Sequence, residues 1–417
     1  MALFAKLESQ LMAHQEKQRM RIRYSMQQGE YGRCQVAGEC YVNFASNDYL
    51  GLSQHHALKQ AAVQAINHYG VGSGSSAQVT GFHPEHEALQ KELAEWLQVD
   101  AVLLYSSGYM ANIGTLTALL SSEAPVIHDR ENHASLLDGS LQAHAHIRRF
   151  AHNNMQDLTR LLKKLTVRDM FHQLDKSCNE DPVAKNLAGT PTKRSLWVVS
   201  EALFSMDGHQ VPMAELLGLI ERYQVNALLD ETHSLGIFGE QGRGLSTCLS
   251  QLPENGLMTA GLGKAFGVMG GIAAGSCCLI EYLTQFSRSA IYTTAQPPAW
   301  AAAARASLAL IRSREGDELR ERLQTNIDYF LALCKKQGVV YEEGSLSPIQ
   351  VIILKTEQRA LQWQQALKEQ GFWVAAMRPP SVAQGASRLR ITVTAAHCKA
   401  DIQRFVEALA YLQEQAL

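Results

Sequence analysis

The stretch 101–120, AVLLYSSGYMANIGTLTALL, joins an apolar run to a helical pattern through a short turn that contains Gly108. The run AVLLY has the length and aliphatic content of a buried strand, and the residues after it read as a glycine turn entering a helix. Similar apolar runs recur between helical patterns, at 124–129, 196–204, 225–231 and 271–276. This alternation of strands and helices predicts an α/β domain with a mostly parallel sheet.

The regions around these runs suggest three parts. Residues 1–45 read as an N-terminal helical segment, 46–294 as the large α/β domain, and 295–417 as a smaller α+β C-terminal domain. The stretch 293–326 is predicted to form one long helix entered through two prolines. Residues 163–194 are polar, contain Pro and Gly, and are expected to form a surface excursion.

The composition is that of an ordinary globular protein, with 417 residues, 46% hydrophobic and 19% charged. A formal net charge of −2 gives no electrostatic reason to expect a nucleic-acid partner. The 8 cysteines are scattered and contain no CxxC pair, which favours a reducing, cytoplasmic location. The N-terminus lacks the apolar core of a signal peptide, and no run is long enough to predict a membrane span.

The stretch 258–271, MTAGLGKAFGVMGG, places one lysine, Lys264, among small and apolar residues. Such a lysine could bind a phosphate or act as a nucleophile whose charge the pocket removes. The phosphate-loop pattern G-x-x-x-x-G-K-[ST] fails here, because its first glycine falls on Met258 and Ala265 follows the lysine. The dinucleotide fingerprint G-x-G-x-x-G fails as well. The acidic stretch LLDETH (228–233) looks like the motif that ends a strand in nucleotide hydrolases. Because no phosphate loop precedes it, the sequence does not predict a nucleotide hydrolase.

The nucleophile hypothesis requires partners, and the chain offers them at plausible places. Asp230 ends a predicted strand, where a carboxylate could pair with a pyridine nitrogen, or could simply cap the next helix. The turn at 106–112 opens a helix whose N–H groups suit a phosphate. His133 could stack on a planar ring, and His233 could bond a phenolic oxygen, although single histidines are more often structural.

A metal site is not expected. His83 and His86 have the right spacing for two ligands, but no third cluster of ligands follows them.

Taken together, eleven stretches resemble the α-oxoamine synthases, a family of pyridoxal-phosphate enzymes with the aspartate-aminotransferase fold (fold type I). They run in the family's order from about residue 20 to the end of the chain. The stretches are NFASNDYLGL, VGSGSSAQVTG, SSGYMAN, NHASLLDG, FSMDGHQVP, LLDETHSLG, GEQGRG, GLGKAFG, IYTTAQPP, MRPPS and SRLRITVTAAH. The resemblance is strongest to the member of the family that acts in biotin biosynthesis.

The resemblance implies a role for each matching residue. Three would be catalytic: Lys264 as the Schiff-base lysine, Asp230 at the pyridine nitrogen, and His133, which would also stack on the ring and could donate a proton. The remaining cofactor contacts would come from Gly108, Tyr109, Ser205, His233, Thr293 and Thr294, with a threonine supplied by a second subunit. Besides His133, the substrate contacts would come from Arg21 and Ser381 for the acyl group and Arg390 for the amino-acid carboxylate.

The implied reaction is an acyl transfer. L-Alanine would condense with a pimeloyl thioester, carried by acyl carrier protein or CoA, to give 8-amino-7-oxononanoate, CO₂ and the free carrier. The family implies a homodimer with active sites at the interface. Ser234, which follows His233, departs from the pattern expected for the biotin-pathway member. It keeps open a related synthase with another amino acid or acyl group, such as glycine C-acetyltransferase or a synthase of a signalling α-aminoketone. An inactive relative that only binds the cofactor is a further alternative.

Other departures concern the cofactor site. Family members usually have a threonine three residues before the lysine, where its hydroxyl binds phosphate, and Gly261 stands there in this chain. The family's paired aspartates read Asp230-Glu231, which keeps the essential first acid. Thr259, Ser205 or a water could replace the missing hydroxyl. On this basis Gly261→Thr is expected to tighten cofactor binding or leave it unchanged.

Overall fold

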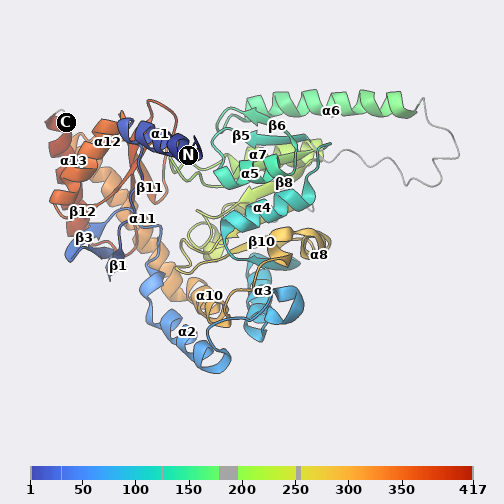
Figure 1. The fold of residues 1–417 in the computed structure, drawn as a ribbon, viewed down its shortest axis with the longest axis horizontal. Helices are drawn as coiled ribbons and strands as arrows, with labels where there is room; N and C mark the ends of the chain where they lie inside the picture. Colours follow the sequence, from blue (N-terminus) through green and yellow to red (C-terminus); the bar gives the residue numbers. More distant parts are fainter. Residues whose placement is uncertain (1, 30, 124, 178–195, 250–254, 416–417) are drawn as a thin grey trace. The chain divides into compact units, whose positions relative to one another are not determined.

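The computed structural model describes residues 2–29, 31–123, 125–177, 196–249 and 255–415 (Figure 1). It divides into two compact units. Unit 1 combines residues up to 56 with 205–209 and 313–417, and unit 2 comprises 57–204 and 210–312.

Unit 2 is built on a seven-stranded sheet in the order β4-β10-β9-β8-β7-β5-β6. All neighbouring pairs from β9 to β6 are parallel, whereas β10 runs antiparallel to both β4 and β9. The strands are β4 (Ala101–Tyr105), β5 (Pro125–Asp129), β6 (His146–Phe150), β7 (Trp197–Glu201), β8 (Asn226–Asp230), β9 (Gly256–Gly261) and β10 (Gly271–Gly275). This is the mostly parallel sheet that the sequence predicts.

Helices cover both faces of this sheet (Figure 1). The helices are α2 (His56–Tyr69), α3 (Pro84–Leu97), α4 (Gly108–Leu119), α5 (Ala134–Gln142), α6 (Met155–Ser177), α7 (Met213–Tyr223), α8 (Cys277–Phe286), α9 (Arg288–Ile291) and α10 (Pro298–Ile311). Side chains alternate along the strands, so Val198 and Leu229 pack with α6 and α7, while Val199 and Leu228 pack with α4, α5 and α8. Burial on both faces explains why these strands read as continuous apolar runs.

Among its described residues, unit 1 contains two small sheets and four α-helices. One sheet has the order β1-β2-β3-β12, and the other, β11-β14-β13, is antiparallel. The strands are β1 (Met26–Gln28), β2 (Arg33–Val36), β3 (Glu39–Asn43), β11 (Ile349–Lys355), β12 (Phe372–Trp373), β13 (Ala375–Met377) and β14 (Ser387–Thr392). The helices are α1 (Ala2–Glu16), α11 (Arg314–Gln337), α12 (Glu357–Glu369) and α13 (Lys399–Glu414). The predicted α+β character of the C-terminal region is therefore confirmed.

Two local predictions need correction. The N-terminal helix ends at Glu16, and part of the segment predicted as helical forms β1, β2 and β3 instead. The stretch 293–326 forms α10 and α11 rather than one helix, because Ser313 has extended backbone angles and caps α11 by accepting a hydrogen bond from Gly316 N. Of the predicted excursion at 163–194, the first part continues α6 to Ser177, and residues 178–194 lie outside the described residues.

The helices of the described ranges include none with both the length and the apolar character needed to cross a membrane.

Candidate active site

Six strands of the unit 2 sheet point their carboxyl ends to the same edge, and several of the predicted cofactor residues of this unit follow them. Gly108 comes after β4, His133 after β5, and Lys264 after β9, while Asp230 is the last residue of β8. In parallel sheets this edge is where ligands bind, since loops and helix N-termini gather there. The fold therefore brings chain positions far apart in sequence to one edge.

Backbone segments approach each other closely at the start of α4. Ser107 caps this helix, its Oγ accepting a hydrogen bond from Met110 N at 3.2 Å. A β-carbon on Gly108 would lie 2.9 Å from Cα of Gly261, and one on Gly271 would lie 2.4 Å from the carbonyl oxygen of Ser107. Glycine is required at such contacts, and the first N–H groups of the helix have no acceptor within it. This glycine cradle (Gly108, Gly261 and Gly271) has the chemistry of an anion site.

The carboxylate of Asp230 is held in one orientation by two donors. The residue is 5% exposed, its Oδ2 accepts from Asn112 Nδ2 at 2.6 Å, and its Oδ1 accepts from Thr232 N at 2.9 Å. A turn rather than a helix follows Asp230, so the alternative of a helix cap does not apply. A buried, oriented carboxylate at a strand end can hold a proton on a ligand nitrogen.

A hydrogen-bond chain connects Asp230 to His133. Asn112 Nδ2 also donates to Ser135 Oγ at 2.9 Å, and Ser135 Oγ lies 2.7 Å from His133 Nδ1. Thr259 Oγ1 donates to the remaining acceptor, Asn112 Oδ1, at 2.6 Å. Since Ser135 N donates to His133 Nδ1, that nitrogen is an acceptor, and the ring proton of the neutral imidazole belongs on Nε2.

Asn112 and Ser135 had no predicted role, although both lie inside stretches that resemble the family, SSGYMAN and NHASLLDG. Only the folded structure shows that these two polar residues meet between two predicted site residues.

His133 is positioned through its main chain as well. Its backbone N–H donates to Glu201 Oε1 at 2.5 Å, and Glu201 N donates to Asn132 Oδ1 at 3.2 Å. Asn132 Nδ2 in turn donates to Val199 O at 2.8 Å. The imidazole itself is exposed, so it can face a ligand.

Glu231, the second acid of the pair, supports the fold. It is fully buried, and its carboxylate accepts hydrogen bonds from Leu245 N at 3.0 Å, from Ser246 N at 2.6 Å and from the hydroxyl of Ser234. Ser234 is thus turned onto Glu231 and is also fully buried. The unusual serine after His233 is accounted for by this local contact.

The other predicted cofactor residues of unit 2 differ in exposure. Lys264 is half-buried on the loop between β9 and β10, and His233 is buried. Tyr109 is exposed and its hydroxyl donates to Asp138 on α5. Thr293 is half-buried and Thr294 is exposed.

His83 and His86 form the start of α3. His86 Nδ1 accepts from His83 N at 3.0 Å, and His86 Nε2 lies 2.8 Å from the carbonyl oxygen of Gln296. Both ring nitrogens of His86 are therefore engaged in local structure.

Unit 1 holds the remaining predicted residues. The guanidinium of Arg390 is buried and is oriented by three oxygens, because its Nε donates to Ser205 O at 2.6 Å and its Nη1 donates to Asn47 Oδ1 and Thr392 Oγ1, each at 3.1 Å. A guanidinium fixed in this way presents a positive charge that suits a carboxylate.

Arg21 and Ser381 meet in unit 1, where Arg21 Nη2 lies 3.3 Å from Ser381 Oγ. Both line a cavity of about 570 Å³. Its walls combine basic and apolar side chains, including Arg19, Arg23, Arg378, Ile22, Tyr24, Leu361 and Met377. Such a cavity can bind an apolar chain that ends in an acidic group.

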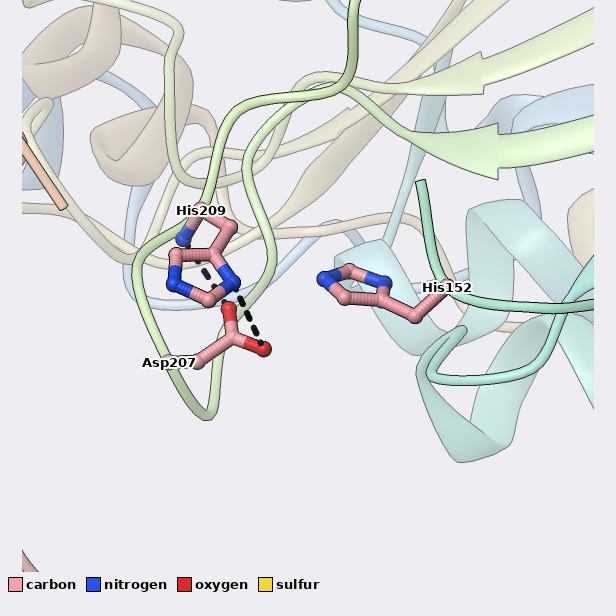
Figure 2. Close-up of side chains that lie close together, drawn as sticks. All are labelled: His152, Asp207 and His209. Carbon is pink, nitrogen blue, oxygen red and sulfur yellow. Dashed lines mark hydrogen bonds and ion pairs between the residues drawn. The ribbon is translucent and has the colours of Figure 1, made fainter. Parts of the chain in front are cut away.

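The loop 205–209 carries a polar pair, Asp207 and His209 (Figure 2). His209 N donates to Asp207 Oδ1 at 2.9 Å, and His209 Nδ1 lies 3.5 Å from Asp207 Oδ2. His152, drawn in the same figure, bonds within unit 2 to Asp129 Oδ1 at 3.0 Å and packs edge-on against Phe204. These side chains stabilise their own segments.

Comparisons with known proteins agree with this architecture. The family described as "Aminotransferase class I and II" matches residues 39–409. A serine palmitoyltransferase from S. paucimobilis, solved with a PLP–myriocin aldimine, is similar with 24% identity and a TM-score of 0.87, over 99% of this chain and 98% of that one. The serine palmitoyltransferase from Sphingomonas wittichii is 24% identical with a TM-score of 0.83, over 99% of this chain and 97% of that one. An 8-amino-7-oxononanoate synthase from Francisella tularensis is 27% identical with a TM-score of 0.73, over 90% of this chain and 99% of that one.

These findings confirm the fold and identify the cofactor as pyridoxal 5'-phosphate. The residues of unit 2 fit this group. The glycine cradle at the start of α4 suits its phosphate, and the oriented carboxylate of Asp230 suits its pyridine nitrogen.

Proposed function

Because this chain belongs to the aminotransferase class I and II family, we propose that it is an acyltransferase of the α-oxoamine synthase type. Its proposed reaction joins L-alanine to a pimeloyl thioester on acyl carrier protein or CoA. One carbon–carbon bond forms, the alanine carboxylate leaves as CO₂, and the carrier thiol is released. The product is 8-amino-7-oxononanoate, an intermediate of biotin biosynthesis.

The cofactor supplies one kind of chemistry, an electron-withdrawing ring that stabilises negative charge on the α-carbon of a bound amino acid. Asp230 keeps a proton at the pyridine nitrogen, and Asn112 and Thr232 N hold its carboxylate in place. Lys264 would hold the cofactor covalently, and its amine would accept the α-proton of the bound amino acid. His133 would stack over the ring, and its Nε2 would present a proton.

The substrate roles belong to unit 1. Arg390, with Nε and Nη1 held by protein oxygens, binds the alanine carboxylate and so orients the α-carbon bonds. The cavity with Arg21 and Ser381 receives the acyl chain, and an arginine there pairs with the carboxylate at the far end of a pimeloyl group. We infer that the enzyme works as a homodimer, in which Thr293 or Thr294 reaches the partner's phosphate site.

The observation that carries the choice of acyl group is this cavity, because it combines apolar walls with several arginines. Arg19 already pairs with Glu357 at 2.9 Å, so the anionic end of the acyl chain would meet the other arginines of the cavity, Arg21 among them. The alternative is a related synthase with another amino acid or acyl group, and its support was the serine at position 234. Ser234 is fully buried and hydrogen-bonded to Glu231, so a structural role accounts for the serine at this position.

The test compares two thioesters of equal chain length, pimeloyl and heptanoyl, with L-alanine as co-substrate. The proposal expects Arg21→Ala to lower kcat/KM for pimeloyl thioester by about tenfold or more, as expected for a lost charge-assisted contact, with little effect on the heptanoyl compound. Equal losses for both compounds would contradict this role of Arg21. Lys264→Ala should abolish turnover and the absorbance of covalently bound cofactor, and a normal absorbance would contradict its assignment.

A further inference from the structure

We propose that the hydroxyl of Thr232 positions the phosphate of the cofactor, and that it takes the place that Gly261 leaves without a side chain. This inference rests on the cofactor of the family and is independent of which acyl group the enzyme uses. Thr232 is not among the residues that the sequence patterns predicted for this role.

Thr232 reaches the glycine cradle through its side chain. Its Oγ1 accepts a hydrogen bond from Gly261 N at 2.8 Å and lies 3.5 Å from the position of a β-carbon on Gly108, the first residue of α4. Within the described ranges, no protein acceptor receives the hydrogen of this hydroxyl. It is therefore available to donate to an oxygen bound at the start of α4.

The backbone of Thr232 is fixed by a hydrogen bond to Asp230, the residue proposed to contact the pyridine nitrogen. Its N–H donates to Asp230 Oδ1 at 2.9 Å, so the carboxylate for the pyridine nitrogen and the hydroxyl for the phosphate are two residues apart on one turn. Thr232 is half-buried, which leaves part of the residue open to a ligand. The turn after β8 thus serves both ends of the cofactor.

Thr259, which the sequence suggested as a source of the phosphate-binding hydroxyl, already donates its hydroxyl hydrogen to another residue. It is fully buried, and its hydroxyl hydrogen is donated to Asn112 Oδ1 at 2.6 Å. Moving it to a phosphate would leave the Asn112 oxygen without its donor. Thr259 therefore supports Asn112.

The two positions compete for the same space, which explains why residue 261 is glycine. A β-carbon on Gly261 would lie 3.1 Å from Cγ2 and 3.5 Å from Oγ1 of Thr232. A threonine at 261 would require the side chain of Thr232 to shift by a few tenths of an ångström. The structure therefore favours the opposite of the sequence-based expectation, namely that Gly261→Thr alone weakens cofactor binding.

The test measures binding of pyridoxal phosphate and of pyridoxal, which lacks the phosphate, to the apo form of the full chain. Thr232→Val keeps the shape and removes the hydroxyl, and Thr232→Ser keeps the hydroxyl. We expect the valine variant to bind pyridoxal phosphate about 10- to 100-fold more weakly, with unchanged affinity for pyridoxal. The serine variant should behave like the wild type. If the valine variant weakens both compounds equally, or neither, the proposal is wrong.

A double variant tests the shared space. Thr232→Ala and Gly261→Thr should each weaken binding alone, and their combination should restore affinity to within about threefold of the wild type, since neighbouring sites are not additive. If the fold-losses in affinity of the two single variants multiply in the double variant, the two side chains do not substitute for each other. Neither experiment uses an acyl thioester, so a failure here differs from a failure of the proposed reaction.

Discussion

Asn112 is the residue on which the geometry of the unit 2 site depends most. Its amide nitrogen donates to both Asp230 and Ser135, and its oxygen accepts from Thr259. Only an amide offers two donors and an acceptor in one planar group of this size. Asn112 thereby couples the acid of the pyridine nitrogen to the hydrogen-bond partner of His133.

Replacing Asn112 by aspartate should therefore impair catalysis. A second carboxylate 2.6 Å from Asp230 Oδ2 would repel it and raise the pKa of one of the two groups. We expect kcat to fall about 10- to 100-fold, as for a pKa shift of about one to two units. Steady-state kinetics with L-alanine and pimeloyl thioester measure the effect.

Asn226→Asp is the matched control, since Asn226 is the first residue of β8 and Asp230 the last. It adds the same charge at the other end of the strand. If both variants lose kcat to the same extent, the loss does not depend on where the new charge lies, and the proposed role of Asn112 is refuted.

At the scale of elements, the strand ends were predictable and the helix boundary at 311–314 was not. Runs such as 226–230 are apolar because they are buried on both faces of the sheet, which makes them visible in the sequence. Two strands of this sheet were not predicted: the edge strand β6, which contains exposed arginines, and β9, whose sequence GLMTAG contains two glycines and a threonine. The break between α10 and α11 depends on one serine inside a continuous helical pattern.

Ser313→Ala should destabilise unit 1 by about 1 kcal/mol, because the start of α11 loses its side-chain cap. Urea-induced unfolding followed by circular dichroism measures the change in free energy. Arg314→Ala is the control, since its side chain is 92% exposed and its ion pair with Glu318 contributes little. A serine variant as stable as the wild type would show that this cap does not define the helix start.

For the whole molecule, each unit contains a buried histidine that should make stability depend on pH. Burial lowers the pKa of His397 in unit 1 to about 4 and that of His128 in unit 2 to about 3. In the unfolded chain both titrate near ~6.5. As pH falls from about 6.5 towards 4, the unfolded state binds more protons than the folded state, and stability is lost.

His397→Gln should flatten this dependence. The imidazole of His397 is stacked on Phe44, and its Nδ1 accepts from Thr394 N at 3.0 Å, so the variant loses some stability at neutral pH. The expected result is a smaller fall in Tm between about pH 6.5 and 4 than in the wild type. Parallel Tm curves for the two proteins would contradict the assignment of this titration to His397.

The sequence alone predicted the fold class, five of the seven strands of the large sheet, and residues that the structure places at its strand ends. It could do so because Gly108, Asp230 and Lys264 lie in stretches whose local pattern is distinctive. It did not reveal Asn112, Ser135 and Thr232, since their partners are distant in sequence or set by a turn. Their roles depend on which side chains meet after folding, and polar residue type does not specify that.

The central claim is that the chain forms a carbon–carbon bond between L-alanine and a pimeloyl thioester with loss of CO₂. Mass spectrometry with alanine labelled at either the carboxyl carbon or the α-carbon tests this most directly. We predict 8-amino-7-oxononanoate that retains the α-carbon label and loses the carboxyl label as CO₂. A product formed only from glycine or serine, or only with another acyl group, would contradict the account.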